Sequence, residues 1–150
     1  SEGITSGATN LILMVNHAET DTIGLDPGLN NIGHQRADRL NYILSEVPIS
    51  QMYMSHFRRT YLTGVPIIQA RGTEVFRYEP DNLDLFAEIL LGQREKISLV
   101  IGHNDAFPTL MTYLLDKKET GFTFTDHDYL VIAEMKQGVV HTLYKFKYLP

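Results

Sequence analysis

The sequence contains no cysteine. This absence excludes disulfide bonds, thiolate metal sites and a cysteine nucleophile, and it leaves the redox compartment of the protein open. Uninterrupted apolar runs of about 18 residues or more are also missing, so the sequence predicts no membrane span. The densest basic spots, Arg58-Arg59 and Lys117-Lys118, are too short for a footprint on a phosphate backbone. Together with a formal net charge of -5, they predict no nucleic-acid partner.

What is present fits one ordinary globular domain. The chain has 150 residues, of which 43% are hydrophobic and 21% are charged. We expect a flexible N-terminal segment over residues 1–9 and a single domain over residues 10–150. The polar start of the chain is compatible with a trimmed tag or with removal of a signal peptide. Both a cytoplasmic and an exported (periplasmic) location therefore stay open.

Predicted strands alternate with predicted helices along most of the chain. Short apolar runs predict strands at residues 11–15, 52–54, 75–78 and 98–101, and helical spacing or helix-start signals predict helices at 29–44, 59–70, 83–91 and 107–115. In the first helix, Leu29, Ile32, Leu40, Ile43 and Leu44 follow the spacing of a buried face. Such alternation is typical of a mixed sheet with helices on both faces.

Three further local signals refine this prediction. Pro66 is expected to bend or interrupt the second helix. Asp81 or Asn82 is expected to cap the third helix. At the end of the chain, the apolar segments 129–133 and 139–148 flank a Lys-Gln-Gly turn, which predicts a hairpin.

Polar segments follow three of the predicted strands. They are residues 16–20, 55–63 and 102–105, and they contain His17, Arg59 and His103. Ligands in open α/β sheets bind at the carboxyl ends of the strands, so we expect these side chains to converge on one site. Two imidazoles and a guanidinium suit a phosphoryl group, whose negative charge is spread over three oxygens.

A metal site is the alternative chemistry for the same histidines. His17 and His103 with Asp105 as a carboxylate ligand would form a chemically reasonable set. A metal ion there would leave the presence of the positively charged Arg59 beside it unexplained. The residues therefore favour a phosphate site without a metal.

The order of these motifs resembles the histidine phosphatase superfamily, also called the phosphoglycerate mutase-like family. The resemblance extends over residues 11–150. It is carried by Asn16-His17-Ala18-Glu19, by Leu29 to Gly33 followed by Gln35 and Ala37, by Ser55 to Gly64, and by Gly102-His103. These resemble the family patterns Arg-His-Ala-Glu, Leu-Thr-x-x-Gly-x-x-Gln-Ala with its Gln shifted by one, Ser-x-x-x-Arg-[Ala/Thr]-x-x-Thr-Ala, and the motif of the second catalytic histidine. Residues 102–108 and the closing hairpin are similar to a small, often exported, single-domain subgroup.

The resemblance implies a three-layer α/β/α sandwich with a mostly parallel sheet and a C-terminal hairpin. It also implies a two-step phosphatase in which His17 becomes a phosphohistidine, and Arg59 and His103 hold the phosphoryl oxygens. A neutral His17 and a protonated His103 would give a bell-shaped pH dependence. The expected substrate is a phosphomonoester or phosphohistidine, on a small molecule or a phosphoprotein, with no cofactor and no metal. The oligomeric state is left open.

The departure from the family pattern that bears on catalysis is at position 16. Asn16 stands where the family has an arginine that binds phosphate. An amide donates hydrogen bonds but carries no charge, and a charge-assisted hydrogen bond contributes about 1.5–3 kcal/mol. Arg58 and, less favoured, Arg36 are the candidates to replace the missing cation. The alternative function is a catalytically impaired phosphate-binding module, and an interaction domain without a phosphate site is the least favoured.

The remaining site residues follow from their positions beside these motifs. Asp105 is the first candidate for the proton donor to the leaving group, and Glu79 is the second. Thr20, Asn104 and Glu79 join Asn16 and Arg59 as expected substrate-binding residues. We expect Glu19 to orient its loop or to cap a helix instead of acting on substrate. His127 and His141 are expected to have structural roles, and His34 and His56 to be loop or helix-face residues.

Overall fold

The structure is a computed structural model, and it describes residues 10–103, 105–115 and 127–150. The predicted N-terminal segment 1–9 and the predicted substrate-binding residue Asn104 lie outside these described residues. Within them, no helix is long and apolar enough to cross a membrane.

Six strands form one sheet in the order β3-β2-β4-β1-β5-β6. The strands are β1 (Asn10–Asn16), β2 (Gln51–Met54), β3 (Glu74–Arg77), β4 (Ile97–Gly102), β5 (Tyr129–Lys136) and β6 (Val139–Lys147). The first four pair in parallel, whereas β5 runs antiparallel to β1 and β6 antiparallel to β5. The mostly parallel sheet with a C-terminal hairpin is therefore confirmed.

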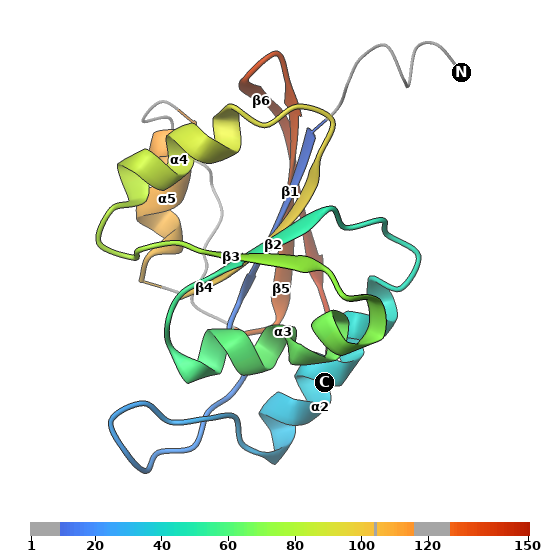
Figure 1. Cartoon of the computed structure of the whole chain (residues 1–150), viewed down its shortest axis with the longest axis vertical. Coiled ribbons are helices and arrows are strands. Elements are labelled where there is room, and N and C mark those ends of the chain that lie inside the picture. The colour runs from blue at the N-terminus through green and yellow to red at the C-terminus, as the bar shows by residue number, and fades with distance from the viewer. Residues whose placement is uncertain (1–9, 104, 116–126) are drawn as a thin grey trace.

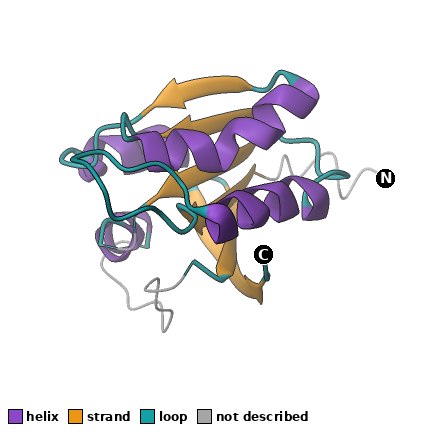
Figure 2. Cartoon of the chain, turned by 90° about the horizontal axis from the view of Figure 1, so that it is seen from below, coloured by secondary structure: helices purple, strands orange, loops and turns teal. Residues whose placement is uncertain are grey.

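The helices cover both faces of this sheet. They are α2 (Asn31–Ile43), α3 (Arg58–Arg71), α4 (Leu83–Leu91) and α5 (Phe107–Leu114). Figure 1 shows α4 beside α5, and α2 beside α3, and Figure 2 shows the twisted sheet against which the helices pack. This arrangement is the three-layer α/β/α sandwich.

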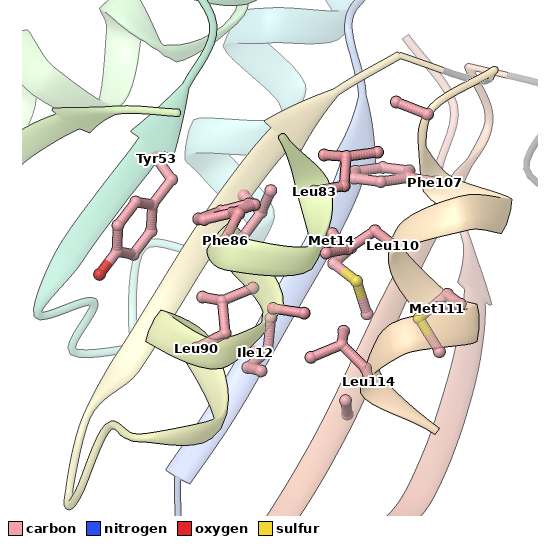
Figure 3. Close-up of a cluster of buried hydrophobic side chains, with 14 of the residues drawn as sticks. Ile12, Met14, Tyr53, Leu83, Phe86, Leu90, Phe107, Leu110, Met111 and Leu114 are labelled. Atoms are coloured by element: carbon pink, nitrogen blue, oxygen red, sulfur yellow. The ribbon is translucent and has the colours of Figure 1, made fainter. Parts of the chain in front are cut away.

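Successive side chains of β1 point alternately into two apolar layers, one on each face of the sheet. Ile12 and Met14 point toward α4 and α5, where they meet Phe86, Phe107 and other apolar side chains (Figure 3). Each fully buried aliphatic or aromatic side chain contributes about 1.5–3 kcal/mol relative to an exposed one. This layer holds the start of α5, and with it the chain that follows β4, against the sheet.

The opposite face of β1 contributes to the second layer. Leu13 and Val15 are buried there with Leu40 of α2 and Ile67 of α3. Because both faces of β1 are covered, its sequence is continuously apolar instead of alternating. The same burial fixes where β1 ends, and therefore where the polar segment after it begins.

Helix α2 is shorter than the predicted 29–44, because it begins at Asn31 and ends at Ile43. Leu29 is buried but precedes α2, where it forms an antiparallel bridge with Thr20. Ile32 and Ile43 lie in α2 but are 52% and 38% exposed, so they are not part of the buried face. The apolar periodicity predicted too early a start for the helix, because Leu29 is buried in a turn at a spacing that also fits a helix.

Two local predictions differ in detail from the structure. Helix α3 runs through Pro66 without interruption. Asn82 occupies the N-cap position of α4, but its side chain makes no capping hydrogen bond. The cap that does form is one the sequence prediction missed: the Asn30 side chain accepts a hydrogen bond from Gly33 N–H at the start of α2.

Candidate active site

His17 follows β1 at the carboxyl edge of the sheet. Its backbone N–H donates to the carbonyl of Gly102 at 2.9 Å, which ties it to the end of β4. Its ring Nδ1 lies 2.8 Å from the carbonyl oxygen of Ala18. A carbonyl can only accept, so Nδ1 carries the proton and Nε2 holds a free lone pair in the neutral ring. Burial lowers the pKa of His17, which keeps the ring neutral and nucleophilic.

His103 follows β4 and lies beside His17. The two ring centroids are 5.7 Å apart. Nε2 of His103 is hydrogen-bonded with the hydroxyl of Ser55 at 2.9 Å, and that hydroxyl is also bonded with Thr60 Oγ1 at 3.0 Å. Ser55, which directly follows β2, therefore orients the second imidazole through its Nε2.

The protonation state of His103 differs from the sequence-based expectation. Burial, with smaller contributions from the charge of Arg59 and from His17, lowers the pKa of His103 to about 4. The ring is therefore neutral in the unliganded site at neutral pH, instead of protonated. An arriving phosphate dianion acts in the opposite direction, because an opposite charge favours the protonated ring.

Arg59 lies in the first turn of α3 and lines the same cavity as His103. Its guanidinium carbon is 4.2 Å from the ring centroid of Phe57, and that ring meets His103 edge-on at 5.2 Å. Phe57 thus lies between the guanidinium and the imidazole. The positive charge of Arg59 contributes to the lowered pKa of both His17 and His103, so it acts on both rings.

Thr63 connects the segment after β1 to α3. Its hydroxyl accepts a hydrogen bond from Ala18 N–H at 2.9 Å and donates to the carbonyl of Arg59 at 2.7 Å. The side chain is fully buried. Arg59 therefore faces the cavity. Thr63 links the helical turn that carries Arg59 to the loop of His17.

Arg58 and Arg36 are not placed to replace the missing cation at Asn16. Arg58 is exposed and lines a neighbouring cavity, and its side chain reaches the backbone carbonyl of Asp26. Arg36 is 3% exposed, and it binds both carboxylate oxygens of Glu19 at 2.9 Å. These two hydrogen bonds outweigh the effect of burial and hold the pKa of Glu19 below its usual range. The expectation that Glu19 orients its loop agrees with this pair.

The sequence analysis missed the position of His127. Its Nδ1 lies 2.5 Å from the carbonyl oxygen of His17, and its ring meets the ring of His17 edge-on at 5.3 Å. Three imidazoles therefore stand together, with His17 in contact with the other two. The residues lie 110 positions apart, and the only signal in the sequence is that the segment before β5 must return to the carboxyl edge of β1.

A cavity of about 350 Å³ lies beside His103 and Arg59. It is lined by Phe57, Arg59, Pro80, Asp81, Leu83, His103, Asp105, Ala106 and Thr109. Asp105 therefore faces the expected site, and Asp81 is a second carboxylate there that the sequence analysis did not consider as an acid. Glu79 lines a different cavity with Tyr53 and Tyr78.

The other predicted binding residues have different surroundings. Asn16 is the last residue of β1, is 3% exposed and pairs in register with Gly102. Thr20 shapes the loop: its carbonyl accepts a hydrogen bond from the side chain of Asn30. As for a metal, the described residues contain no group of three or more His, Cys, Asp or Glu side chains arranged to hold an ion, and His17, His103 and Asp105 do not form one.

Comparison with known proteins gives one family. The sequence profile of the histidine phosphatase superfamily (branch 1) matches residues 12–98. Phosphoserine phosphatase 1 of Hydrogenobacter thermophilus is 34% identical over 73 residues, which are 44% of this chain and 35% of that protein. The match thus spans about a third of the length of this curated relative.

Solved structures of low sequence identity share the fold. The protein histidine phosphatase SixA complexed with tungstate superposes with a TM-score of 0.72 at 14% identity, covering 91% of this chain and 96% of that one. A phosphoglycerate mutase from Plasmodium falciparum superposes with a TM-score of 0.64 at 18% identity, covering 95% of each chain.

Proposed function

Because the chain belongs to the histidine phosphatase superfamily, we propose that it is a phosphatase that works through a phosphohistidine at His17. The observation that carries the proposal is the hydrogen bond from Nδ1 of His17 to the Ala18 carbonyl. This bond leaves Nε2 as the nucleophile, next to the imidazole of His103 and within reach of the Arg59 charge. Nucleophilic catalysis divides one difficult displacement into two easier steps.

In the first step, the lone pair of His17 Nε2 attacks phosphorus and the bond from phosphorus to the leaving oxygen breaks. Arg59 and His103 stabilise the charge on the three equatorial oxygens. Asp105, on the cavity wall, donates the proton that the leaving oxygen needs. Asp81 lines the same cavity and is the second candidate for this proton.

In the second step, water attacks the phosphorus of the phosphohistidine and the P–N bond breaks. The carboxylate formed in the first step takes the proton of the water, which restores the acid and releases inorganic phosphate. Nε2 of His17 regains its lone pair, and the Nδ1 hydrogen bond keeps the ring in place throughout.

The substrate class that fits is a phosphomonoester or a phosphohistidine. The related proteins carry the names phosphoserine phosphatase and protein histidine phosphatase, and both names are consistent with this class. The cavity of about 350 Å³ can admit a phosphorylated side chain as well as a small phosphorylated molecule.

A second candidate function rests on Asn16. This buried amide stands in place of a guanidinium, so one positive charge of the family site is missing at this position. A chain with the remaining groups would still bind phosphate but would turn over slowly or not at all. The protein would then be a phosphate-binding module.

Hydrolysis of p-nitrophenyl phosphate between pH 5 and 8, with the wild-type protein, His17→Ala and Asn16→Arg, separates these functions. The phosphatase proposal expects turnover that His17→Ala abolishes, and a transient phosphoryl label that acid releases. Turnover only in Asn16→Arg would identify the binding module. If no protein turned over and phosphate did not raise the melting temperature, both proposals would be wrong.

A further inference from the structure

We propose that His127 is the second cation of the phosphate site and supplies the charge that Asn16 does not. This inference rests on the proposed function, because it concerns the same phosphoryl group. It assigns a direct role to a residue that lies outside every motif by which the site was found.

The first argument is the position of the ring. Nδ1 of His127 lies 2.5 Å from the backbone carbonyl of His17, so this nitrogen carries a proton and the ring is held against the nucleophile. The rings of His127 and His103 both contact the ring of His17, with centroids 5.3 and 5.7 Å away. A phosphoryl group bonded to His17 is therefore next to both neighbouring imidazoles.

The second argument is the rigidity of the segment that carries His127. The neighbouring Asp128 binds the guanidinium of Arg36 at 2.7 Å, and its carbonyl accepts from Tyr148 N–H at 2.6 Å. The same guanidinium binds Glu19 two residues after His17. One buried arginine thus joins the loop of His17 to the segment of His127, which fixes the distance between the two rings.

The third argument is the charge around the ring. The ionisable groups near His127 are His17 and Glu19 after β1, Arg36 from α2 and the adjacent Asp128. Two carboxylates share one guanidinium, so this group has a net charge of minus one and a protonated His127 would balance it. For the described residues, no hydrogen bond is seen at Nε2 of His127, so in the protonated ring its N–H is available to donate to phosphate.

A purely structural role is the competing explanation, since the hydrogen bond to His17 alone would position the nucleophile. Two substitutions distinguish the roles. His127→Asn keeps an N–H donor near the position of Nδ1 but removes Nε2 and the charge. His127→Gln keeps a neutral donor near the position of Nε2 and removes the bond to His17. His141→Asn is the matched control, because His141 is an exposed histidine on β6.

The first test measures binding of inorganic phosphate by calorimetry at pH 6 and pH 8, and it does not require turnover. If His127 is the second cation, His127→Asn binds phosphate about 10–100-fold more weakly than wild type at pH 6, and the difference shrinks at pH 8. Wild type also takes up more protons per phosphate bound at pH 7 than His127→Asn does. His141→Asn behaves as wild type. Unchanged affinity and unchanged proton uptake in His127→Asn would overturn the proposal.

A second measurement uses wild type and covers the case in which a variant does not fold. In ¹⁵N spectra of the histidine rings, His127 should gain a proton when phosphate is added at pH 7. A His127 signal that phosphate does not change would contradict the proposal without any substitution.

Turnover separates this inference from the proposed function. We expect Asn16→Arg to recover most of the activity that His127→Asn loses, and to remove the decline in rate at alkaline pH. If wild type binds phosphate as described but never hydrolyses an ester, the phosphatase proposal fails and the cation stands. If wild type hydrolyses the ester and His127→Asn does so equally well across the pH range, the phosphatase stands and the cation is wrong.

Discussion

At the scale of single residues, side chains behind the candidate site set the geometry of those that line it. Ser55 orients His103, Thr63 joins the loop of His17 to the turn of Arg59, and the Ala18 carbonyl selects the tautomer of His17. Each contact is a single hydrogen bond, whose net worth to stability is about 0.5–1.5 kcal/mol. The larger effect is on position, because a catalytic group displaced by about 1 Å loses much of its effect.

Adjacent arginines provide the prediction at this scale. Arg59→Gln should lower kcat/KM for p-nitrophenyl phosphate by about 10–100-fold, since a charge-assisted bond to a phosphoryl oxygen is worth about 1.5–3 kcal/mol. Arg58→Gln should change it by less than about threefold, because that side chain contacts Asp26 and lines another cavity. The melting temperature of each variant provides the folding control. Equal losses in both variants would show that the first turn of α3 does not separate the two side chains as described.

Some residues of the site can be predicted from the sequence around them, whereas others depend on contacts between distant parts of the chain. His17 and His103 are predictable because each directly follows a strand, Arg59 is predictable because it lies in the segment after β2, and parallel strands end at one edge. The contact of His127 with His17 was not predictable, because it depends on the path of a segment 110 residues later in the chain. The neutral state of His103 was not predictable either, since burial lowers its pKa and burial is a property of the packed molecule.

At the scale of elements, α2 is positioned by contact with the loop that carries His17. Asn30 N–H donates to the carbonyl of Glu19 at 3.0 Å, and the Asn30 side chain caps the helix at Gly33. Gly33 packs directly on the backbone of Glu19, and a Cβ atom there would overlap with the Glu19 carbonyl oxygen. The glycine of the Leu-Thr-x-x-Gly pattern therefore serves a close backbone approach, which brings Arg36 onto Glu19 one turn later.

Gly33→Ala tests this contact. Overpacking of a tight contact typically costs about 1–3 kcal/mol, which exceeds the gain of about 1 kcal/mol from helix propensity. We therefore expect a net loss of unfolding free energy in urea, and a fall in activity because the loop of Glu19 and His17 shifts. His34→Ala, at an exposed position of the same helix, is the control and should change both quantities little. A Gly33→Ala protein as stable and active as the control would mean that α2 adjusts without moving the loop.

The positions of the elements were largely predictable, and their edges were less so. Hydrophobic runs located every described strand because both faces of the central strands are buried. The start of α2 was misjudged because Leu29 packs on the core from a turn. The continuity of α3 through Pro66 reflects packing that overrides a local helix breaker.

At the scale of the whole molecule, the site joins the two ends of the described chain. The guanidinium of Arg36 binds Glu19 after the first strand, Asp128 before the fifth and the carbonyl of Tyr148. These segments meet only when the C-terminal hairpin is paired with β1. Conditions that disturb the site should therefore be visible in the global stability of the domain.

Low pH is such a condition. The lowered pKa of His103 determines whether the unfolding free energy rises or falls with pH. The pKa of His103 is about 4 in the folded protein, against the ordinary value of 6.5, so between these values the unfolded chain binds more protons. Its contribution to stability is fully present above pH 6.5 and is lost as the pH falls from 6.5 toward 4. His17, whose pKa burial also lowers, acts in the same direction.

We therefore expect the unfolding free energy in urea to fall between pH 7 and pH 5, with His103 contributing on the order of 1 kcal/mol. His103→Gln, whose amide can keep the contact with Ser55, should show a flatter decline over this interval, while the exposed-site variant His34→Gln should follow wild type. Saturating phosphate should also flatten the decline, because the bound dianion favours protonation of the buried rings. A decline of equal slope in wild type and His103→Gln would place the acid sensitivity elsewhere, since the only titrating group removed is the buried imidazole.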